Sequence, residues 1–116
     1  MNPKQPNPAR PVFCPLKKEY FQLVRDGHKV WEIRSAGSPV GRAVLRRIPP
    51  FPIVLRRGYS GDVVAATAVE VLWFPSLECI PEEVLGGACT TLRDLKELGI
   101  RGEVVAVRFE VTEHGG

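Results

Sequence analysis

The sequence lacks any run of apolar residues that approaches the roughly 20 needed to cross a bilayer, and its first residues form no secretory signal. It has only three cysteines and two histidines and no C-x-x-C pair, which excludes a disulfide framework or a zinc site. We therefore expect a cytoplasmic protein without metal or cofactor. We expect the three cysteines to be buried as small hydrophobic residues; they are Cys14, Cys79 and Cys89. The alternative, a nucleophilic thiol, would need His28 or His114 as its base.

Acidic residues are absent from the stretch 33–61, although it contains six arginines. The remaining residues, 62–116, carry ten acidic and four basic side chains. A basic block without counter-charges attracts polyanions, which favours a nucleic-acid surface. The alternative is a solvated segment whose arginines pair with the acidic half of the chain. The six arginines are Arg34, Arg42, Arg46, Arg47, Arg56 and Arg57.

The composition is that of one soluble globular domain, with 116 residues of which 44% are hydrophobic and 25% charged. Residues 1–11 are rich in proline and are predicted to form an extended lead-in. Residues 12–113 are predicted to form the domain, since no repeat or internal linker divides them. Residues 35–52 hold two glycines and four prolines and are predicted to form a long loop, with at most a short extended piece.

Patterns of apolar residues predict five strands and three helices. The long apolar strand is expected to bend, as strands do in barrels. The expected strands cover residues 11–16, 29–34, 53–57, 63–74 and 103–111. The expected helices cover residues 16–26 (ended by Gly27), 80–85 and 90–99 (capped by Thr91 through Asp94). Strands outnumber helices, which indicates an α+β fold, a small mixed or antiparallel β-barrel with about three short helices.

The segment G-H-K-V-W-E-I-R resembles the hallmark of the ASCH domain family, G-x-K-x-x-E-x-R, with Gly27, Lys29, Glu32 and Arg34 in the fixed positions. The Gly-Asp pair before the long strand and the late helix also match, so the resemblance covers most of residues 12–113. It implies a PUA-like barrel with a cleft lined by the charged residues of the motif. It also implies binding of RNA or nucleotides.

Some members of that family resemble small hydrolases that remove acyl groups from N4-acylated cytidine, and others are associated with nuclease activity. The hydrolase members use a lysine, a threonine three residues later, and a glutamate just ahead of the late helix. Lys29 matches the lysine, but Glu32 stands in place of the threonine and Ala88 stands near the position of the glutamate. The resemblance therefore carries no complete catalytic set. Lys29 and Glu32 are catalytic candidates only if the chain is an enzyme.

Strand periodicity also brings the charged residues of the motif together. Glu32 and Arg34 share one face of a strand, and Lys29 follows a turn, so all three can meet at one end of the barrel. Arginine offers a rigid fork to a phosphate or base edge, and glutamate accepts from an exocyclic amine. The alternative is an internal ion pair that fixes the strand. Trp31, of opposite parity, is expected in the core, with base stacking as the alternative.

We therefore predict a module that binds RNA or a nucleotide-like ligand and has no membrane contact. The alternatives are a hydrolase of a modified nucleoside, a ribonuclease, or a domain whose arginines dock an acidic partner. Thr90 and Thr91 offer amides to an anion, although capping is the expected role. The predicted binding residues are Lys29, Glu32 and Arg34 in the cleft, Arg46, Arg47, Arg56 and Arg57 in an adjacent Arg-rich loop, and Tyr59 and Ser60 in a turn.

Overall fold

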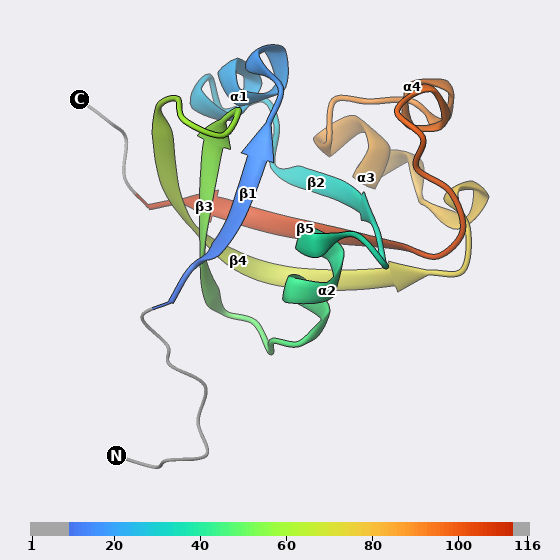
Figure 1. The fold of residues 1–116 in the computed structure, drawn as a ribbon. Helices are drawn as coiled ribbons and strands as arrows, with labels where there is room; N and C mark the ends of the chain where they lie inside the picture. Colours follow the sequence, from blue (N-terminus) through green and yellow to red (C-terminus); the bar gives the residue numbers. More distant parts are fainter. Residues whose placement is uncertain (1–9, 113–116) are drawn as a thin grey trace.

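The computed structural model describes residues 10–112, which form one curled five-stranded sheet with four α-helices around it (Figure 1). The strand order is β1-β3-β4-β5-β2. The strands are β1 (Val12–Leu16), β2 (Trp31–Ser35), β3 (Phe51–Arg57), β4 (Val63–Phe74) and β5 (Val104–Val111). The helices are α1 (Lys18–Arg25), α2 (Pro39–Leu45), α3 (Glu82–Gly87) and α4 (Leu92–Glu97), with a 3₁₀ turn at Leu77–Cys79.

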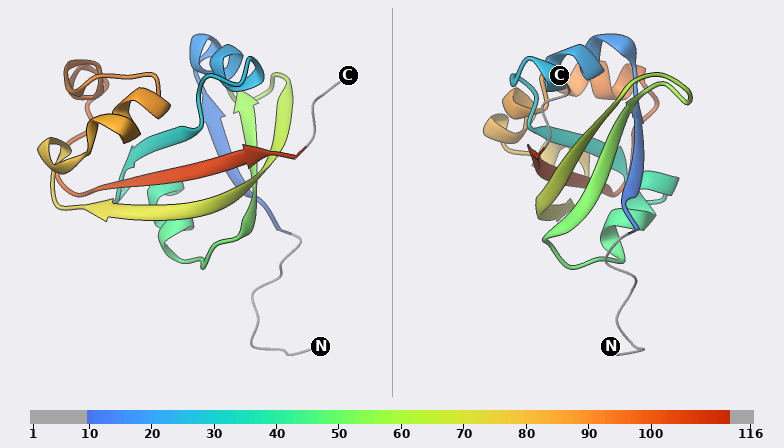
Figure 2. Two further views of the ribbon diagram at one scale, coloured as in Figure 1. Left: turned by 180° about the vertical axis from the view of Figure 1, so that it is seen from behind. Right: turned by 90° about the vertical axis from the view of Figure 1, so that its left-hand side faces the viewer.

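The sheet is mixed, because β1 pairs with β3 in parallel and every other pairing is antiparallel. Strands β1 and β2 stand at its two ends, and curling brings these ends toward each other, as Figure 2 shows from two sides. The result is a half-barrel rather than a closed barrel. The predicted α+β fold with a small mixed β-barrel is therefore confirmed, with the barrel open between β1 and β2 and four α-helices in place of the expected three.

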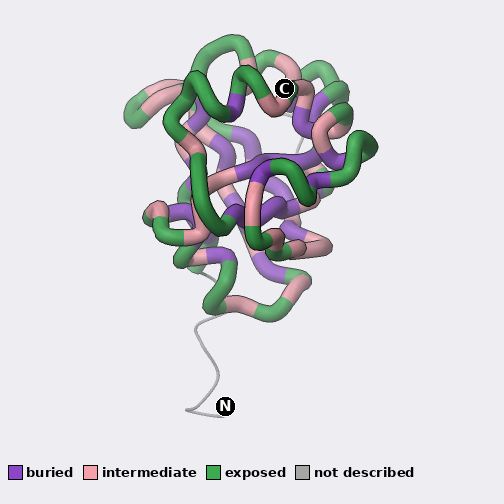
Figure 3. The backbone as a smooth tube through the Cα atoms, turned by 90° about the vertical axis from the view of Figure 1, so that its right-hand side faces the viewer, coloured by how far each residue is buried: buried purple, intermediate pink, exposed green. Residues whose placement is uncertain are grey.

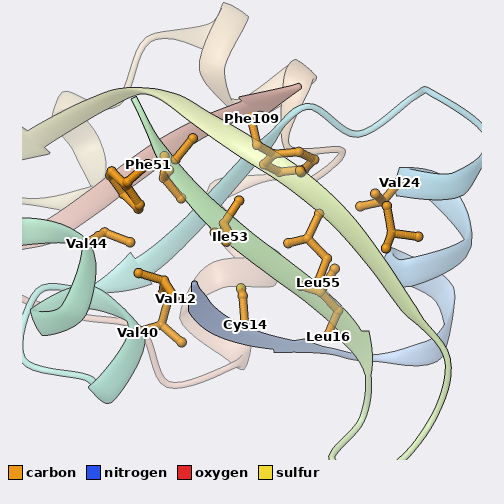
Figure 4. Packing of buried hydrophobic residues seen from close by; sticks show 14 of the residues in the cluster. Val12, Cys14, Leu16, Val24, Val40, Val44, Phe51, Ile53, Leu55 and Phe109 are labelled. Atoms are coloured by element: carbon orange, nitrogen blue, oxygen red, sulfur yellow. The ribbon is translucent and has the colours of Figure 1, made fainter. Parts of the chain in front are cut away.

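The core inside the half-barrel follows from strict alternation along the first and third strands. Val12, Cys14 and Leu16 of β1 point inward and meet Ile53 and Leu55 of β3, and each of the five is at most 4% exposed. Side chains from β4, β5, α1 and α2 complete this cluster (Figure 4). Burial is concentrated in the strands, whereas turns and outer helix faces are exposed (Figure 3).

A second core lies on the opposite side of β2 and β5. Strand β5 is buried on both faces over its first half, because Val105 and Val107 enter the first core while Val104 and Ala106 pack under α3 and α4. Strand β4 reaches both regions because its register with β5 shifts between Ala68 and Glu70, which bends a twelve-residue strand. The predicted bend is therefore confirmed.

The helix signals read from the sequence correspond to real helix ends. Helix α1 ends at Arg25, and Gly27 follows with φ of +81°, a conformation that favours glycine. Thr91 caps α4, since its hydroxyl accepts from the amide of Asp94 at 3.1 Å.

The interpretation of residues 35–52 as a loop was wrong, because α2 lies within them. Ser38 caps this helix by accepting from the amide of Gly41, and Pro39 occupies its first turn. Val40 and Val44 are buried in the first core and anchor it.

The predicted proline-rich lead-in lies almost wholly outside the described residues, as does His114. Within residues 10–112, no helix is long and apolar enough to span a membrane.

Candidate functional site

Arg34 joins the two free edges of the sheet. It projects from β2, and its Nη2 donates to the carbonyl oxygen of Pro15 in β1 and lies 3.6 Å from Cys14 Sγ. Its Nε donates to Glu32 Oε2 on its own strand. The side chain of Arg34, rather than backbone pairing, therefore bridges β1 and β2. The gap between the two strands is left partly open around this side chain.

Lys29, just before β2, is the most deeply buried charge of the motif, with 3% exposure. Its Nζ donates to the carbonyl oxygens of Trp31 at 2.8 Å and Ala88 at 2.7 Å, and it lies 2.9 Å from Glu32 Oε1. The ring of Tyr20 stands 5.1 Å away, at cation–π distance. A protonated lysine has three donors, and here three oxygens accept them.

Glu32 stands between the two cations and holds both of them. One carboxylate oxygen faces Lys29 and the other faces Arg34, and Glu32 itself is 8% exposed. We call Lys29, Glu32 and Arg34 the ionic chain. The structure thus brings the three side chains together at one end of the half-barrel, and it also contains the internal ion pairs of the alternative interpretation.

A cavity of about 440 Å³ opens beside the ionic chain, in the gap between β1 and β2. This volume falls in the range of small-molecule sites in proteins. The ionic chain forms its polar part, together with Lys17 and Thr90. Its other lining residues are Pro15, Leu16, Tyr20, Ile33, Tyr59, Ala88, Leu95, Leu98 and Ile100. A cavity with charged groups at one place and mostly apolar and aromatic walls elsewhere suits an aromatic heterocycle that carries polar edge groups.

Donors and acceptors remain free beside this cavity. A carboxylate offers about four acceptor positions, and Lys29 and Arg34 use two of those on Glu32. Within residues 10–112, Nη1 of Arg34 makes no hydrogen bond, and the buried hydroxyl of Thr90 has no partner. A buried polar group without a partner is uncommon in folded proteins, and a bound ligand would satisfy it.

Cys14 does not supply a nucleophile to this site. Burial and, after it, the negative charge of Glu32 raise the pKa of its thiol to about 12. The reactive thiolate is therefore not formed near neutral pH. Cys14 instead packs in the first core, as predicted for a small hydrophobic residue, whereas the same prediction was wrong for Cys79, which is exposed, and for Cys89, which is half-buried.

The arginines of the predicted Arg-rich loop divide into two pairs at opposite ends of β3. Arg56 and Arg57 end β3, where Arg56 is paired with Pro15 of the cavity lining, whereas Arg46 and Arg47 follow α2 and precede the start of β3. Six residue steps along a strand span about 20 Å. None of the four lines the cavity. The expectation of one Arg-rich loop adjacent to the cleft was therefore wrong for Arg46 and Arg47.

The turn between β3 and β4 contributes one residue to the cavity. Tyr59 lines its mouth and is 87% exposed, whereas Ser60 is not among the lining residues. Trp31 takes the predicted core position, since it is buried with α3 in the second core. Sequence reasoning missed the apolar walls supplied by Leu95 and Leu98, because leucines at helical spacing give no sign of a cavity beside them.

The geometry thus defines a class, a small half-barrel with an ion-paired cavity between its edge strands. Solved structures place the fold more narrowly. The ASCH structure from Zymomonas mobilis matches at a TM-score of 0.61 and 15% identity, over 88% of this chain and 66% of that one. The hypothetical protein PH0355 matches at a TM-score of 0.62 and 17% identity, over 85% of this chain and 96% of that one. EF3133 from Enterococcus faecalis V583, of family DUF984, matches at a TM-score of 0.57 and 16% identity, over 83% of this chain and 68% of that one.

The ASCH-like fold expected from the G-x-K-x-x-E-x-R segment is therefore confirmed. At identities of 17% or less, these likenesses concern the fold alone. No protein-family model and no curated protein matches the sequence.

Proposed function

We propose that this protein is a binding module that takes a nucleotide, free or as a unit of RNA, into the cavity between β1 and β2. The observation that carries the proposal is the juxtaposition of Arg34 and Glu32 at that cavity. Together they offer a hydrogen-bond donor beside an acceptor, fixed by their mutual ion pair. Nucleobase edges present the complementary combination of acceptors and donors.

Charge supports an anionic ligand. The lining includes three basic residues, Lys17, Lys29 and Arg34, and one acidic residue, Glu32. This excess of positive charge attracts a phosphate, and the half-exposed or exposed rings and leucines at the mouth can pack against a base. The ASCH-like fold agrees with a nucleic-acid-binding role.

Hydrolysis of a modified nucleoside or of RNA is less well supported. A lysine that acts as nucleophile or base must lose its proton, yet the ammonium of Lys29 is held by two carbonyl oxygens and a carboxylate. Glu32 occupies the position of the hydrolase threonine and is itself engaged by two cations. An enzyme that used Lys29 and Glu32 would have to break the ion pairs of the ionic chain at each turnover.

The test is a titration of nucleoside monophosphates and of a short single-stranded RNA, followed by NMR shifts. We expect shifts around the cavity and an RNA affinity that falls linearly in log–log form with salt between about 50 and 300 mM. Leu98→Trp fills the cavity from a half-exposed position and should abolish binding. Ile48→Trp, at a position that is 88% exposed and outside the cavity lining, is the matched control.

Binding that survives Leu98→Trp, or shifts confined to other faces, would refute the proposal. Release of acid from an N4-acylated cytidine by the wild-type protein would instead favour the hydrolase.

A further inference from the structure

The outer face of β1, β3 and β4 carries a second feature, separate from the cavity. No helix within the described residues lies in front of these strands in the right-hand view of Figure 2. Alternation along the strands turns Phe13, Val54, Arg56 and Val63 outward while their neighbours enter the first core. Phe13 is 47% exposed, a large apolar side chain on an open sheet.

Arg56 lies over this exposed ring. Its Cζ stands 4.3 Å from the centroid of Phe13, and its Nη1 donates to the carbonyl oxygen of Tyr59 at 3.0 Å. The ring and the hydrogen bond hold the guanidinium from two sides. We call Phe13 and Arg56 the stacking platform. Nucleobases stack both on aromatic rings and on guanidinium planes.

The charge of this face suits a polyanion. The three adjoining stretches, 12–16, 51–57 and 63–67, contain no acidic residue, and Arg56 is the arginine at an outward-facing position in them. Acidic side chains flank these stretches on two sides: Asp62 precedes β4 and lies 3.9 Å from Arg25, and Glu70 and Glu110 on the side toward β5 both contact Arg108. Phosphates that follow β1 and β3 would therefore meet no uncompensated carboxylate within these stretches.

The stacking platform adjoins the cavity. Pro15 lines the cavity, accepts from Arg34, and is also the β1 partner of Arg56. Neighbouring strands are about 4.8 Å apart, so Arg34 and Arg56 stand on the two sides of one β1 residue. Tyr59 connects them further, because its side chain lies at the cavity mouth and its carbonyl oxygen holds Arg56.

We infer that the stacking platform binds the base next to the one in the cavity, so that the preferred ligand is a single-stranded oligonucleotide rather than a free nucleotide. The inference rests on the proposed function of the cavity and extends it. One base enters between β1 and β2, the backbone passes Tyr59, and the next base stacks on the platform. A double helix does not fit this arrangement, because both bases leave their stack to separate surfaces.

The experiment compares the affinities of a nucleoside monophosphate and a short single-stranded RNA in the same variants. Phe13→Ala should weaken RNA binding about tenfold, the effect of one lost stacking contact, and leave monophosphate binding unchanged. Phe13→Leu retains apolar packing without the ring and should weaken RNA binding similarly. Trp73→Ala is the matched control, since Trp73 is 49% exposed at the far end of β4.

The charge of the platform is tested in the same way. Arg56→Gln should lower RNA affinity and reduce the slope of log affinity against log salt by about 0.7, the value for one phosphate on a single strand. Arg42→Gln, an exposed arginine of α2, should leave both unchanged.

Two failures are distinguishable. If the monophosphate binds but RNA binds no more tightly, or RNA affinity is equal in wild type, Phe13→Ala and Phe13→Leu, the platform inference is overturned and the cavity proposal stands. If neither ligand binds the wild-type protein, the cavity proposal fails, and the inference fails with it. Binding of an acidic peptide, but not RNA, in a manner sensitive to Phe13 also overturns the inference.

Discussion

Replacement of Glu32 by glutamine tests whether the ionic chain holds the open side of the half-barrel together. The substitution keeps the shape of the side chain and removes the one negative charge between Lys29 and Arg34. Lys29 would keep two carbonyl acceptors, and Arg34 would keep the carbonyl oxygen of Pro15. Two cations would then face each other in the gap with no compensating charge.

The magnitude follows from burial. Removal of one partner from a buried ion pair destabilises proteins by about 3–5 kcal/mol, because a desolvated charge is left unpaired. The side chain of Lys29 is 3% exposed and that of Glu32 is 10% exposed, whereas that of Arg34 is 22% exposed and partly solvated. We therefore expect about 3 kcal/mol, the lower end of the range. For a domain of this size, that lowers Tm by about 12 °C.

The assay is urea and thermal unfolding of the wild-type protein, Glu32→Gln and the matched variant Glu70→Gln. Glu70 makes a similar contact, with Arg108 on a neighbouring strand at 3.1 Å, but the two side chains are 42% and 38% exposed. An ion pair this exposed contributes about 1 kcal/mol or less. The comparison isolates burial, since both variants remove one carboxylate that faces an arginine.

Equal destabilisation by Glu32→Gln and Glu70→Gln would refute the argument. A double-variant cycle with Lys29→Met adds a second check. Loss of Lys29 and Glu32 together should be less harmful than the sum of the single losses, with a coupling of about 0.5–3 kcal/mol. Strict additivity would mean that the two charges do not stabilise each other.

Three further predictions concern the surroundings of the site. Folding raises the pKa of Cys14 from 9.0 to about 12, so above pH 9 the folded protein keeps a proton that the unfolded chain releases. The free energy of unfolding should therefore fall as pH rises from 9, by up to about 1.4 kcal/mol per pH unit. Urea unfolding of Cys14→Ala should show a weaker dependence of this free energy on pH. Gly87→Ala should cost about 1–3 kcal/mol in urea unfolding, because its Cβ would stand 2.5 Å from Trp31 Cδ1, whereas Gly86→Ala meets nothing within 4 Å and should gain up to about 1 kcal/mol; equal effects would contradict the packing argument. Thr90→Val removes a buried hydroxyl without a partner, so it should raise the stability of the free protein by up to about 1 kcal/mol. It should also weaken nucleotide binding about fivefold, as measured by calorimetry. Unchanged binding would exclude a contact between the Thr90 hydroxyl and the ligand.

Most strands and two helix ends could be predicted from the sequence because local rules set them. Alternation along the second half of β5, the positive φ at Gly27 and the cap at Thr91 need no information from distant residues. Helix α2 was missed although Ser38 and Pro39 form a regular helix start. The surrounding glycines and prolines outweighed that signal, and the burial of Val40 and Val44 that stabilises the helix is a tertiary effect.

The candidate site shows the same division. The meeting of Lys29, Glu32 and Arg34 could be predicted, because strand parity and a preceding turn suffice. The distribution of arginines could not, since adjacency in sequence does not reveal that a whole strand separates Arg46 from Arg56. The bond between Arg34 and Pro15 also depends on how far the sheet curls, and only the assembled fold determines that.

The two interpretations of the ionic chain, internal ion pair and proposed ligand site, are compatible within one arrangement. Edge strands of a sheet normally need protection, and backbone pairing of β1 with β2 would close the barrel and fill the gap. Here one arginine bridges the edges through a side chain, which spans the gap without filling it. The ion pairs hold Arg34 and Glu32 in place before any ligand arrives, so binding orders few side chains and little conformational entropy is lost. A protein that used these charges for stability alone would gain more from apolar packing, which leaves no cavity behind.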